Sequence, residues 1–317
     1  MSSSNCSAVS TFLLIGIPGL EGVYIWISIP ICLMYFMAVL GNCTILFVIR
    51  TEPSLQEPMY HFLSMLASSD LGLSFSSLPA MLRIFLFNAM GTSVDACIAQ
   101  KFFIHGFTDM ESSVLLIMSF DRFLAICNPL RYHSILTSSR VLHIGLTFAF
   151  KSILLVLPLP LTLKRLKYCN KRLLSHSYCL LQDIMKLACS DNRVNFYYGL
   201  FITLCTMSDS MLIVVSYVFI LKTVLVMAIA SGEGRLKALN TCVSHVCAVL
   251  IFYVPLIGVS VIHRFGKHLS PLTHALMADA YLLIPPVLNP IVYTMKTKEI
   301  RRKLIQIFVP AKVTAEG

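Results

Sequence analysis

The chain has 317 residues and a formal net charge of +10, and 57% of its residues are hydrophobic while only 13% are charged. A water-soluble domain of this composition would expose far too much apolar surface, so the sequence predicts a membrane protein. The basic residues lie in short loops between apolar segments. This placement favours a membrane surface, an acidic ligand or an acidic partner over nucleic acid.

Residues 1–23 form an N-terminal segment that contains Glu21 but no lysine or arginine. Because it has no basic n-region, we expect no cleavable signal peptide, and the first long apolar run is predicted to span the membrane. Asn5, Cys6 and Ser7 match the N-glycosylation sequon, which matters only if this end lies outside the cell.

Seven apolar segments follow, each near or above the roughly 20 residues that a helix needs to cross a bilayer. The sequence therefore predicts an all-α membrane protein, with a seven-transmembrane helix bundle over residues 24–294. No internal repeat of the transporter kind is visible. The segments cover residues 24–49, 58–87, 97–127, 140–163, 196–230, 235–263 and 272–294.

Residues 295–317 form a tail in which basic and apolar residues alternate from 297 to 308. Such a pattern is typical of a short amphipathic helix on the inner leaflet of a membrane. Lysine and arginine divide almost evenly between the two sides, so the positive-inside rule decides little. The N-terminus, which has no basic residue, the basic tail and the loop cysteines favour an extracellular N-terminus and a cytoplasmic C-terminus.

Eleven cysteines divide according to their depth in the predicted membrane. Those inside apolar runs behave as small hydrophobic residues. Four others lie at the start of the third span or in the long polar loop after the fourth, where they imply an oxidising, extracytoplasmic compartment. Three pairings, and free thiols, stay open for Cys97, Cys169, Cys179 and Cys189.

The third span ends in the string Met-Ser-Phe-Asp-Arg-Phe-Leu-Ala-Ile-Cys-Asn-Pro-Leu-Arg-Tyr, residues 118–132. Asp121 and Arg122 place an acid–base pair where the helix meets water, and Pro129 stops the helix. Taken alone, the pair fits a charged switch or an interfacial anchor with a snorkelling arginine.

Six further short motifs lie in or at the start of other spans. They are Gly41-Asn42, Pro58-Met59-Tyr60, Leu63–Ala67, Ser216-Tyr217, Lys237–His245 and Pro285–Tyr293. With the third-span string, their order and spacing resemble those of odorant receptors, within the rhodopsin-like G-protein-coupled receptors. Three short motifs resemble the fish-like class I branch: Ile-Pro-Gly-Leu near the N-terminus, Ala-Leu-Asn at the start of span six and His-Arg-Phe near its end. The long second outer loop resembles that of family 51.

The resemblance implies a plasma-membrane receptor rather than an enzyme. It would bind a small volatile ligand, favouring a short-chain carboxylic acid, and activate a stimulatory heterotrimeric G protein that raises cAMP. Disulfides Cys97–Cys179 and Cys169–Cys189 would hold the second outer loop as a lid. No nucleophile–base pair or metal-ligand spacing appears outside the membrane, so we expect neither catalysis nor a cofactor, apart from a sodium ion.

The resemblance also implies a cytoplasmic switch around Arg122. Pro255 and Pro290 would break helical hydrogen bonds and supply kinks about which span six swings, although a static kink is the alternative. The predicted switch residues are Asp121, Arg122, Tyr217, His245, Tyr253, Asn289, Pro290 and Tyr293.

Asp70 and Glu111 are carboxylates in the middle of their spans, where a buried acid needs a partner, water or an ion. With Asn42, Ser112 and Asn289 expected nearby, they offer hard oxygen ligands for a small cation. The resemblance implies an allosteric sodium site. The alternative is a protonated, hydrogen-bonded pair without an ion.

Arg264, at the outer end of span six, presents a planar fork that matches a carboxylate, and Ser260 lies one turn deeper. The alternative is an interfacial arginine paired with lipid or a loop. Leu181 suggests an apolar ligand tail, and Asp279 could neutralise Arg264. The resemblance places the ligand among His105, Leu181, Gln182, Ser260, Arg264 and Asp279.

Two mid-membrane charges are not explained by the resemblance. Asp109 lies one turn after His105, and Lys151 lies near the middle of span four. An unpaired lysine there would cost about 2.5–3.5 kcal/mol on insertion scales. We therefore predict a buried Asp109–Lys151 pair; the alternative is that Lys151 reaches the ligand as a second acid anchor.

Two rival functions remain open at this point. One is a receptor of the same fold for a non-odorant metabolite, lipid or peptide. The other is a membrane enzyme or transporter that uses Asp70 and Glu111 as a proton relay. The second rival predicts activity without a G protein and without any need for Arg122.

Overall fold

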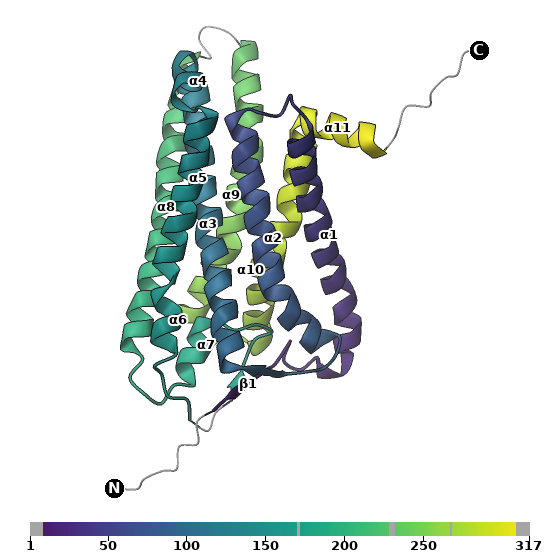
Figure 1. Ribbon diagram of the computed structural model, residues 1–317, viewed down its shortest axis with the longest axis vertical. Helices are drawn as coiled ribbons and strands as arrows, with labels where there is room; N and C mark the ends of the chain where they lie inside the picture. The colour runs from purple at the N-terminus through teal and green to yellow at the C-terminus, as the bar shows by residue number, and fades with distance from the viewer. Residues whose placement is uncertain (1–8, 170–171, 228–231, 267, 309–317) are drawn as a thin grey trace, which may run out of the picture.

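The computed structural model describes residues 9–169, 172–227, 232–266 and 268–308 of the chain. Long helices run side by side in one bundle (Figure 1), which confirms the predicted seven-span architecture. The spans are α1 (Tyr24–Thr51), α2 (Pro58–Phe85), α3 (Val94–Cys127), α5 (Ser138–Val156) with α6 (Pro158–Leu163), α8 (Arg193–Met227), α9 (Gly232–Phe265) and α10 (Pro271–Lys296).

The spans differ in how apolar they are. Among the described residues, five spans are long and apolar enough to cross a membrane by length and composition alone, and α3 with its bent continuation makes a sixth. Helix α2 carries Asp70, Arg83 and a row of serines. Most of those serines donate to carbonyls of their own helix, so α2 satisfies its polar groups internally, as a spanning helix must.

Proline and capping residues correct two predicted boundaries. The span predicted at 140–163 is two helices, because Pro158 lacks the N–H that would continue α5 and instead starts α6. Helix α3 begins at Val94 rather than at 97. The Ser93 hydroxyl accepts from the Ala96 N–H at 3.1 Å and caps it there.

Helix α10 lacks one backbone hydrogen bond at Pro290, and a side chain of α1 supplies the missing donor. Pro290 has no N–H to donate to the Pro286 carbonyl one turn earlier. Asn42 Nδ2 of α1 donates to that carbonyl at 2.9 Å instead. The close approach requires Gly41, because a Cβ there would lie 2.8 Å from Pro290 Cβ. The Gly41-Asn42 motif therefore holds α1 against α10 at Pro290.

A small sheet closes one end of the bundle, which we call the lid end. Strand β1 (Thr11–Leu14) lies between β2 (Gly91–Ser93), its antiparallel partner, and β3 (Leu173–Leu174), its parallel partner. Phe12 and Leu14 are buried while their neighbours are exposed, as a one-sided strand requires. The sheet was not predicted. Helix α7 (Leu181–Lys186) completes the lid.

The opposite end, the tail end, carries the helix predicted at 297–308. Helix α11 (Lys298–Phe308) follows α10 and lies across the end of the bundle (Figure 1). Lys303 Nζ lies 2.8 Å from Glu52 Oε2, next to α1, and Ile300 is fully buried. The loop after α3 forms a turn, Pro129–Arg131, and helix α4 (Tyr132–Ile135).

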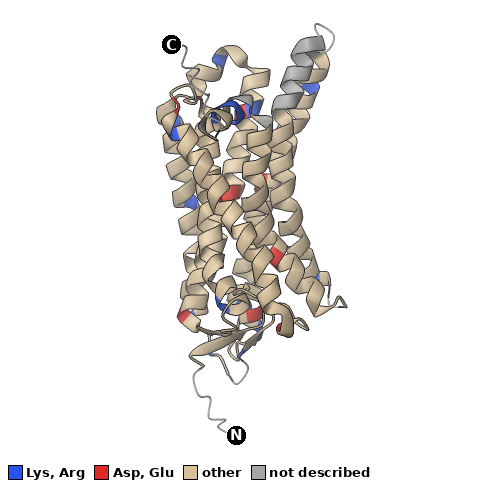
Figure 2. Cartoon of the chain, turned by 90° about the vertical axis from the view of Figure 1, so that its right-hand side faces the viewer, with Lys and Arg blue, Asp and Glu red and all other residues tan. Residues whose placement is uncertain are grey.

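Charged residues gather at the two ends, and few lie between them (Figure 2). Two apolar clusters fill the bundle, one at the lid end around Phe12 and Tyr178 and one at the tail end around Phe62 and Phe252. The charges that do lie in between therefore stand out as candidate functional groups.

Candidate functional site

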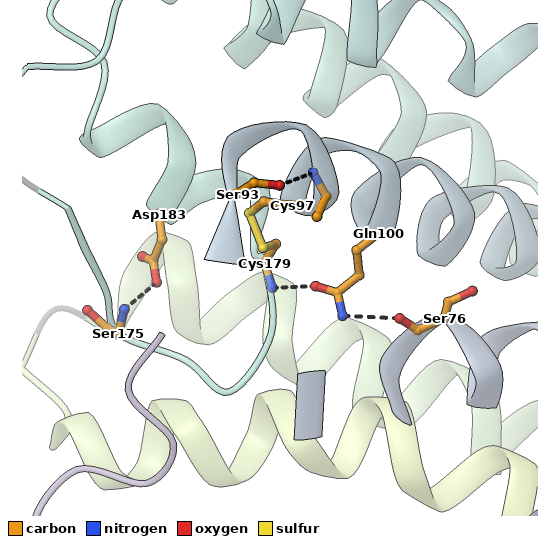
Figure 3. Close-up of a disulfide and its surroundings, with 8 residues drawn as sticks. Ser76, Ser93, Cys97, Gln100, Ser175, Cys179 and Asp183 are labelled. Atoms are coloured by element: carbon orange, nitrogen blue, oxygen red, sulfur yellow. Dashed lines mark hydrogen bonds between the residues drawn. A yellow bond between two sulfur atoms is a disulfide. The ribbon is translucent and has the colours of Figure 1, made fainter. Parts of the chain in front are cut away.

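The lid is held by two disulfides, one that joins it to α3 and one within the lid loop. Cys97–Cys179 and Cys169–Cys189 are disulfides with Cα atoms 5.5 Å and 5.9 Å apart, which confirms the predicted pairing. Beside the first, the Cys179 N–H donates to Gln100 Oε1 at 3.0 Å, and Gln100 Nε2 donates to the Ser76 carbonyl at 3.1 Å (Figure 3). The lid is thus fixed to α3 and, through Gln100, to α2.

An acidic residue organises the lid from inside. Asp183 Oδ2 lies 2.5 Å from His176 Nδ1 and accepts from the Ser175 N–H at 3.2 Å, while Lys186 Nζ lies 3.0 Å from Asp183 Oδ1. Burial by itself raises the pKa of Asp183, but the hydrogen bond and charge of His176, together with Lys186, outweigh it. The pKa of Asp183 is therefore held well below its ordinary value.

Beneath the lid, several buried polar atoms have no hydrogen-bond partner within the part of the chain that the structure describes. A buried group without a partner costs about 1–3 kcal/mol, so such a gathering is unusual for a merely structural core. The atoms belong to α3, α7, α9, α10 and the lid loop: His105 Nε2, Gln182 Oε1, His263 Nε2, Asp279 Oδ2 and His176 Nε2.

The six predicted ligand residues come from α3, α7, α9 and α10 and differ in exposure. Leu181 and Asp279 are buried, and Ser260 is half-buried. Asp279 Oδ1 accepts from the Ser177 hydroxyl and forms no ion pair with Arg264 among the described residues. Arg264 is exposed. The anticipated neutralisation of Arg264 by Asp279 is therefore not seen.

A groove of about 990 Å³ lies elsewhere, on the faces of α1, α2, α3 and α5. It is lined mainly by apolar side chains, among them Phe102, Phe103 and Phe107. None of the six predicted ligand residues lines it. Its size alone does not make it the ligand site, because ligand sites also need polar groups that fix orientation, and the unpartnered polar atoms described above do not line this groove.

Two carboxylates meet in the middle of the bundle. Asn289 Nδ2 donates to Asp70 Oδ2 at 3.1 Å and to Glu111 Oε1 at 3.2 Å. Glu111 Oε2 and Asn289 Oδ1 are buried and have no donor among the described residues. Asn42 and Ser112, expected here, make their hydrogen bonds elsewhere, to Pro286 and to Asp209 and Tyr253.

Lys151 reaches the predicted carboxylate and a second one. Its Nζ lies 3.3 Å from Asp109 and 3.6 Å from Asp209 of α8. Ser152 donates to Asp109 at 2.7 Å, and Ser112 to Asp209 at 2.9 Å. Asp209 was not predicted as a partner of Lys151, although an acid in mid-span is itself a signal of a polar contact.

At the tail end, Arg122 is held by its neighbour. Arg122 Nη2 lies 2.6 Å from Asp121 Oδ2, and the Tyr132 hydroxyl donates to Asp121 Oδ1 at 2.8 Å. Tyr132 was not among the predicted switch residues. It arrives because Pro129 turns the chain back toward α3.

A second polar contact at the tail end joins α8 to α9. His245 Nδ1 lies 2.7 Å from the Tyr217 hydroxyl, and its Nε2 lies 3.0 Å from the Leu115 carbonyl. A neutral ring satisfies both contacts, with Nε2–H donating to the carbonyl and Nδ1 accepting from the phenol. Apart from Asp121, the predicted switch residues form no hydrogen bond or ion pair with Arg122 in the described part of the chain, and those with polar side chains have other partners. Tyr293 lies 4.0 Å from the Met118 sulfur, and Tyr253 bonds to Ser112.

Comparison with known proteins gives this arrangement its context. The family model described as "Olfactory receptor" matches residues 31–311. The chain belongs to the olfactory receptor family. The receptor is 69% identical to human olfactory receptor 51A7 over 96% of this chain and 97% of that protein, and 58% identical to human olfactory receptor 51G2 over 97% and 98%. The resemblance to family 51 is thereby confirmed.

The fold of the receptor is that of rhodopsin. Squid rhodopsin superposes with a TM-score of 0.73 at 18% identity, covering 93% of this chain and 87% of that one. The receptor is thus a multi-pass plasma-membrane G-protein-coupled receptor, with a small-molecule ligand and a G protein as partners, and not an enzyme. The predicted glycosylation site, Asn5, lies outside the described residues.

Proposed function

We propose that the receptor binds a short-chain carboxylic acid beneath its lid and raises cAMP through a stimulatory olfactory-type G protein. In this proposal the lid end and the N-terminus face outside and α11 lies on the cytoplasmic leaflet. The observation that carries it is the group of unpartnered buried atoms on His105, Gln182 and Asp279. His105 Nε2 can donate to the carboxylate of such a ligand, whereas Gln182 Oε1 and Asp279 Oδ2 are acceptors and would take a donor.

The proposed output acts through the tail end. Arg122, bound to Asp121 and backed by Tyr132, would be the resting lock. Ligand binding would favour a state in which Arg122 leaves Asp121 and the ends of α8, α9 and α10 separate. Pro255 lies inside α9 and supplies a bend about which that helix can move.

A sodium ion is proposed at Asp70 and Glu111. The residues fit it, since Glu111 Oε2 and Asn289 Oδ1 are buried oxygen atoms that accept no hydrogen bond from the described residues. Both are hard oxygen donors of the kind small cations prefer. The alternative is a proton shared between the two carboxylates. Ligand affinity that depends on sodium in the wild type, and no longer does in Asp70→Asn and Glu111→Gln, would favour the ion; affinity independent of sodium in the wild type would favour the proton.

A cAMP reporter in cells that carry the receptor tests the proposal. Straight-chain carboxylic acids of increasing length would be compared with alcohols of equal length, with surface receptor measured on the same cells. We expect the acids to be active over a narrow range of chain lengths and the alcohols to be weak. Activity of alcohols with silence of every acid would overturn the acid proposal.

A further inference from the structure

Lys101 is a buried cation outside the polar contacts of the lid, the mid-bundle carboxylates and the tail end. It lies on α3, one turn below Cys97, and is only 3% exposed. In the described part of the chain it forms no ion pair and no hydrogen bond. The other buried cation there, Arg122, is 9% exposed and is paired with Asp121.

An ammonium group removed from water without a partner carries a penalty of several kcal/mol. Lys151 in mid-bundle avoids this penalty with two carboxylates, although its side chain is 37% exposed. Lys101 is more deeply buried and has no carboxylate partner among the described residues. A fold that keeps such a group needs something from outside to complete it, and the group that completes an ammonium is an anion.

The surroundings of Lys101 point toward the ligand region. His105 lies one turn deeper on the same face of α3, and its Nε2 is buried without a partner. Gln182, three residues after Cys179 in the lid, also keeps a buried atom without a partner, but this Oε1 is an acceptor and would take a donor rather than a carboxylate oxygen. The Cys97–Cys179 disulfide and the Gln100–Cys179 hydrogen bond fix the lid over this turn of α3 (Figure 3).

Arg264 differs from Lys101 in its solvation. It is exposed in the last turn of α9. An exposed ion pair contributes about 0–1 kcal/mol, because water solvates and screens both charges. A carboxylate that meets Lys101 would be desolvated together with it, where charge pairs are strong. The same ligand group would therefore gain more at Lys101 than at Arg264.

We propose that Lys101 is the anchor for the ligand carboxylate, with His105 as its hydrogen-bonding neighbour and Arg264 at the rim. This rests on the proposed acid-binding function and names the residue that carries it. The anchor sits on α3, the helix that also ends in Arg122, so ligand charge and cytoplasmic lock share one rigid element.

The test compares Lys101→Met with Arg264→Met and with Lys167→Met, a change at an exposed lysine of the outer loop. Each variant is titrated with an active acid and with its primary amide, which has the same shape without the charge. The acid-to-amide ratio of half-maximal concentrations, taken on the same cells, does not depend on how much receptor reaches the surface. We expect Lys101→Met to raise that ratio at least about 30-fold, Arg264→Met at the rim to change it about threefold or less, and the Lys167→Met control to leave it unchanged.

A second variant, Lys101→Arg, keeps the charge and is expected to keep the wild-type preference for acid over amide. An unchanged ratio in Lys101→Met, or equal losses for acid and amide, would overturn Lys101 as the anchor while leaving the acid proposal intact. A large change in Arg264→Met alone would move the anchor to α9. Wild-type receptor that answers no acid removes the acid proposal first, and the anchor with it.

Discussion

At the lid end, His105, Gln182 and Asp279 each keep a buried atom without a partner, and Lys101 is buried without a counter-charge. At the tail end, Asp121 accepts from both Arg122 and Tyr132, and both nitrogens of His245 are engaged. None of the unpartnered buried atoms in the described residues belongs to these tail-end groups. The lid end thus keeps buried polar atoms without partners, which fits the proposed ligand site, whereas the polar groups at the tail end are bonded, which fits the proposed lock.

This contrast separates binding from switching in physical terms. A ligand gains free energy where polar atoms wait for partners, and a switch resists change where its bonds are already made. Changes at the lid end should alter ligand response or lid integrity, while changes at the tail end should alter signalling without ligand. The predictions below test that division.

Loss of the lid disulfide should have the largest effect. Cys97 and Cys179 are separated by 82 residues, and closing a loop of that size contributes about 4–5 kcal/mol in the chain-entropy model. Cys97→Ser should therefore greatly reduce surface receptor, measured by antibody on intact cells. Cys43→Ser, at a free cysteine, is the control. Normal surface level and normal response in Cys97→Ser would contradict the lid's role.

The second largest effect is expected from the ion group of Lys151, Asp109 and Asp209. Removing one member of a buried ion group costs about 3–5 kcal/mol of stability. Lys151→Met leaves both Asp109 and Asp209 without their cation. We expect surface receptor to fall in that variant, to recover in part with Asp109→Asn, and to recover fully when Asp209→Asn is added. If adding the asparagines lowers expression further, the three residues are not coupled. Normal expression with selective loss of acid response would instead assign Lys151 to the ligand.

The Asp183–His176 contact should contribute about 1.5–3 kcal/mol, as hydrogen bonds to charged groups do. Because the pKa of Asp183 is lowered in the folded lid, its stabilisation is present above the ordinary carboxyl range, near pH 4, and is lost as pH falls below it. The melting temperatures of purified wild type and Asp183→Asn should therefore differ steadily from pH 7 to pH 5 and converge at lower pH. A difference that disappears already between pH 7 and pH 5 would exclude the assigned carboxylate.

The smallest effect is expected at the tail end from Tyr132→Phe. This change removes one hydrogen bond to Asp121, worth about 1.5 kcal/mol, and should raise cAMP without ligand by about tenfold or less. Tyr24→Phe removes a phenol hydrogen bond at the lid end and should leave that basal level unchanged. A rise in the lid-end variant, or none in Tyr132→Phe, would break the division between the two ends.

The predicted features share a local signal. Apolar runs fix the spans, because a bilayer demands about 20 apolar residues whatever surrounds them. Lys151 and Asp109 were paired from their depth alone, since a lone mid-membrane charge needs a partner. The cysteine pairing followed from family resemblance, because the sequence itself left three connectivities open.

The missed features depend on contacts between distant segments. Nothing in the four residues Thr11–Leu14 indicates pairing with both Gly91–Ser93 and Leu173–Leu174. Tyr132 reaches Asp121 only because of the turn at Pro129, and Lys101 reads as an ordinary basic residue near a helix start. Its burial appears only once the lid is in place.

Strand β1 has a consequence for the order in which the protein is made. It is synthesised early, whereas its partner β3 follows about 160 residues later, some 10–30 s at usual rates of translation. For that interval Phe12, fully buried in the finished protein, has no complete lid to pack against. An antibody against residues 11–14 as a free peptide should therefore bind the nascent chain and lose its epitope when the lid assembles. The first strand of the chain therefore cannot complete its sheet until more than half of the receptor has been made.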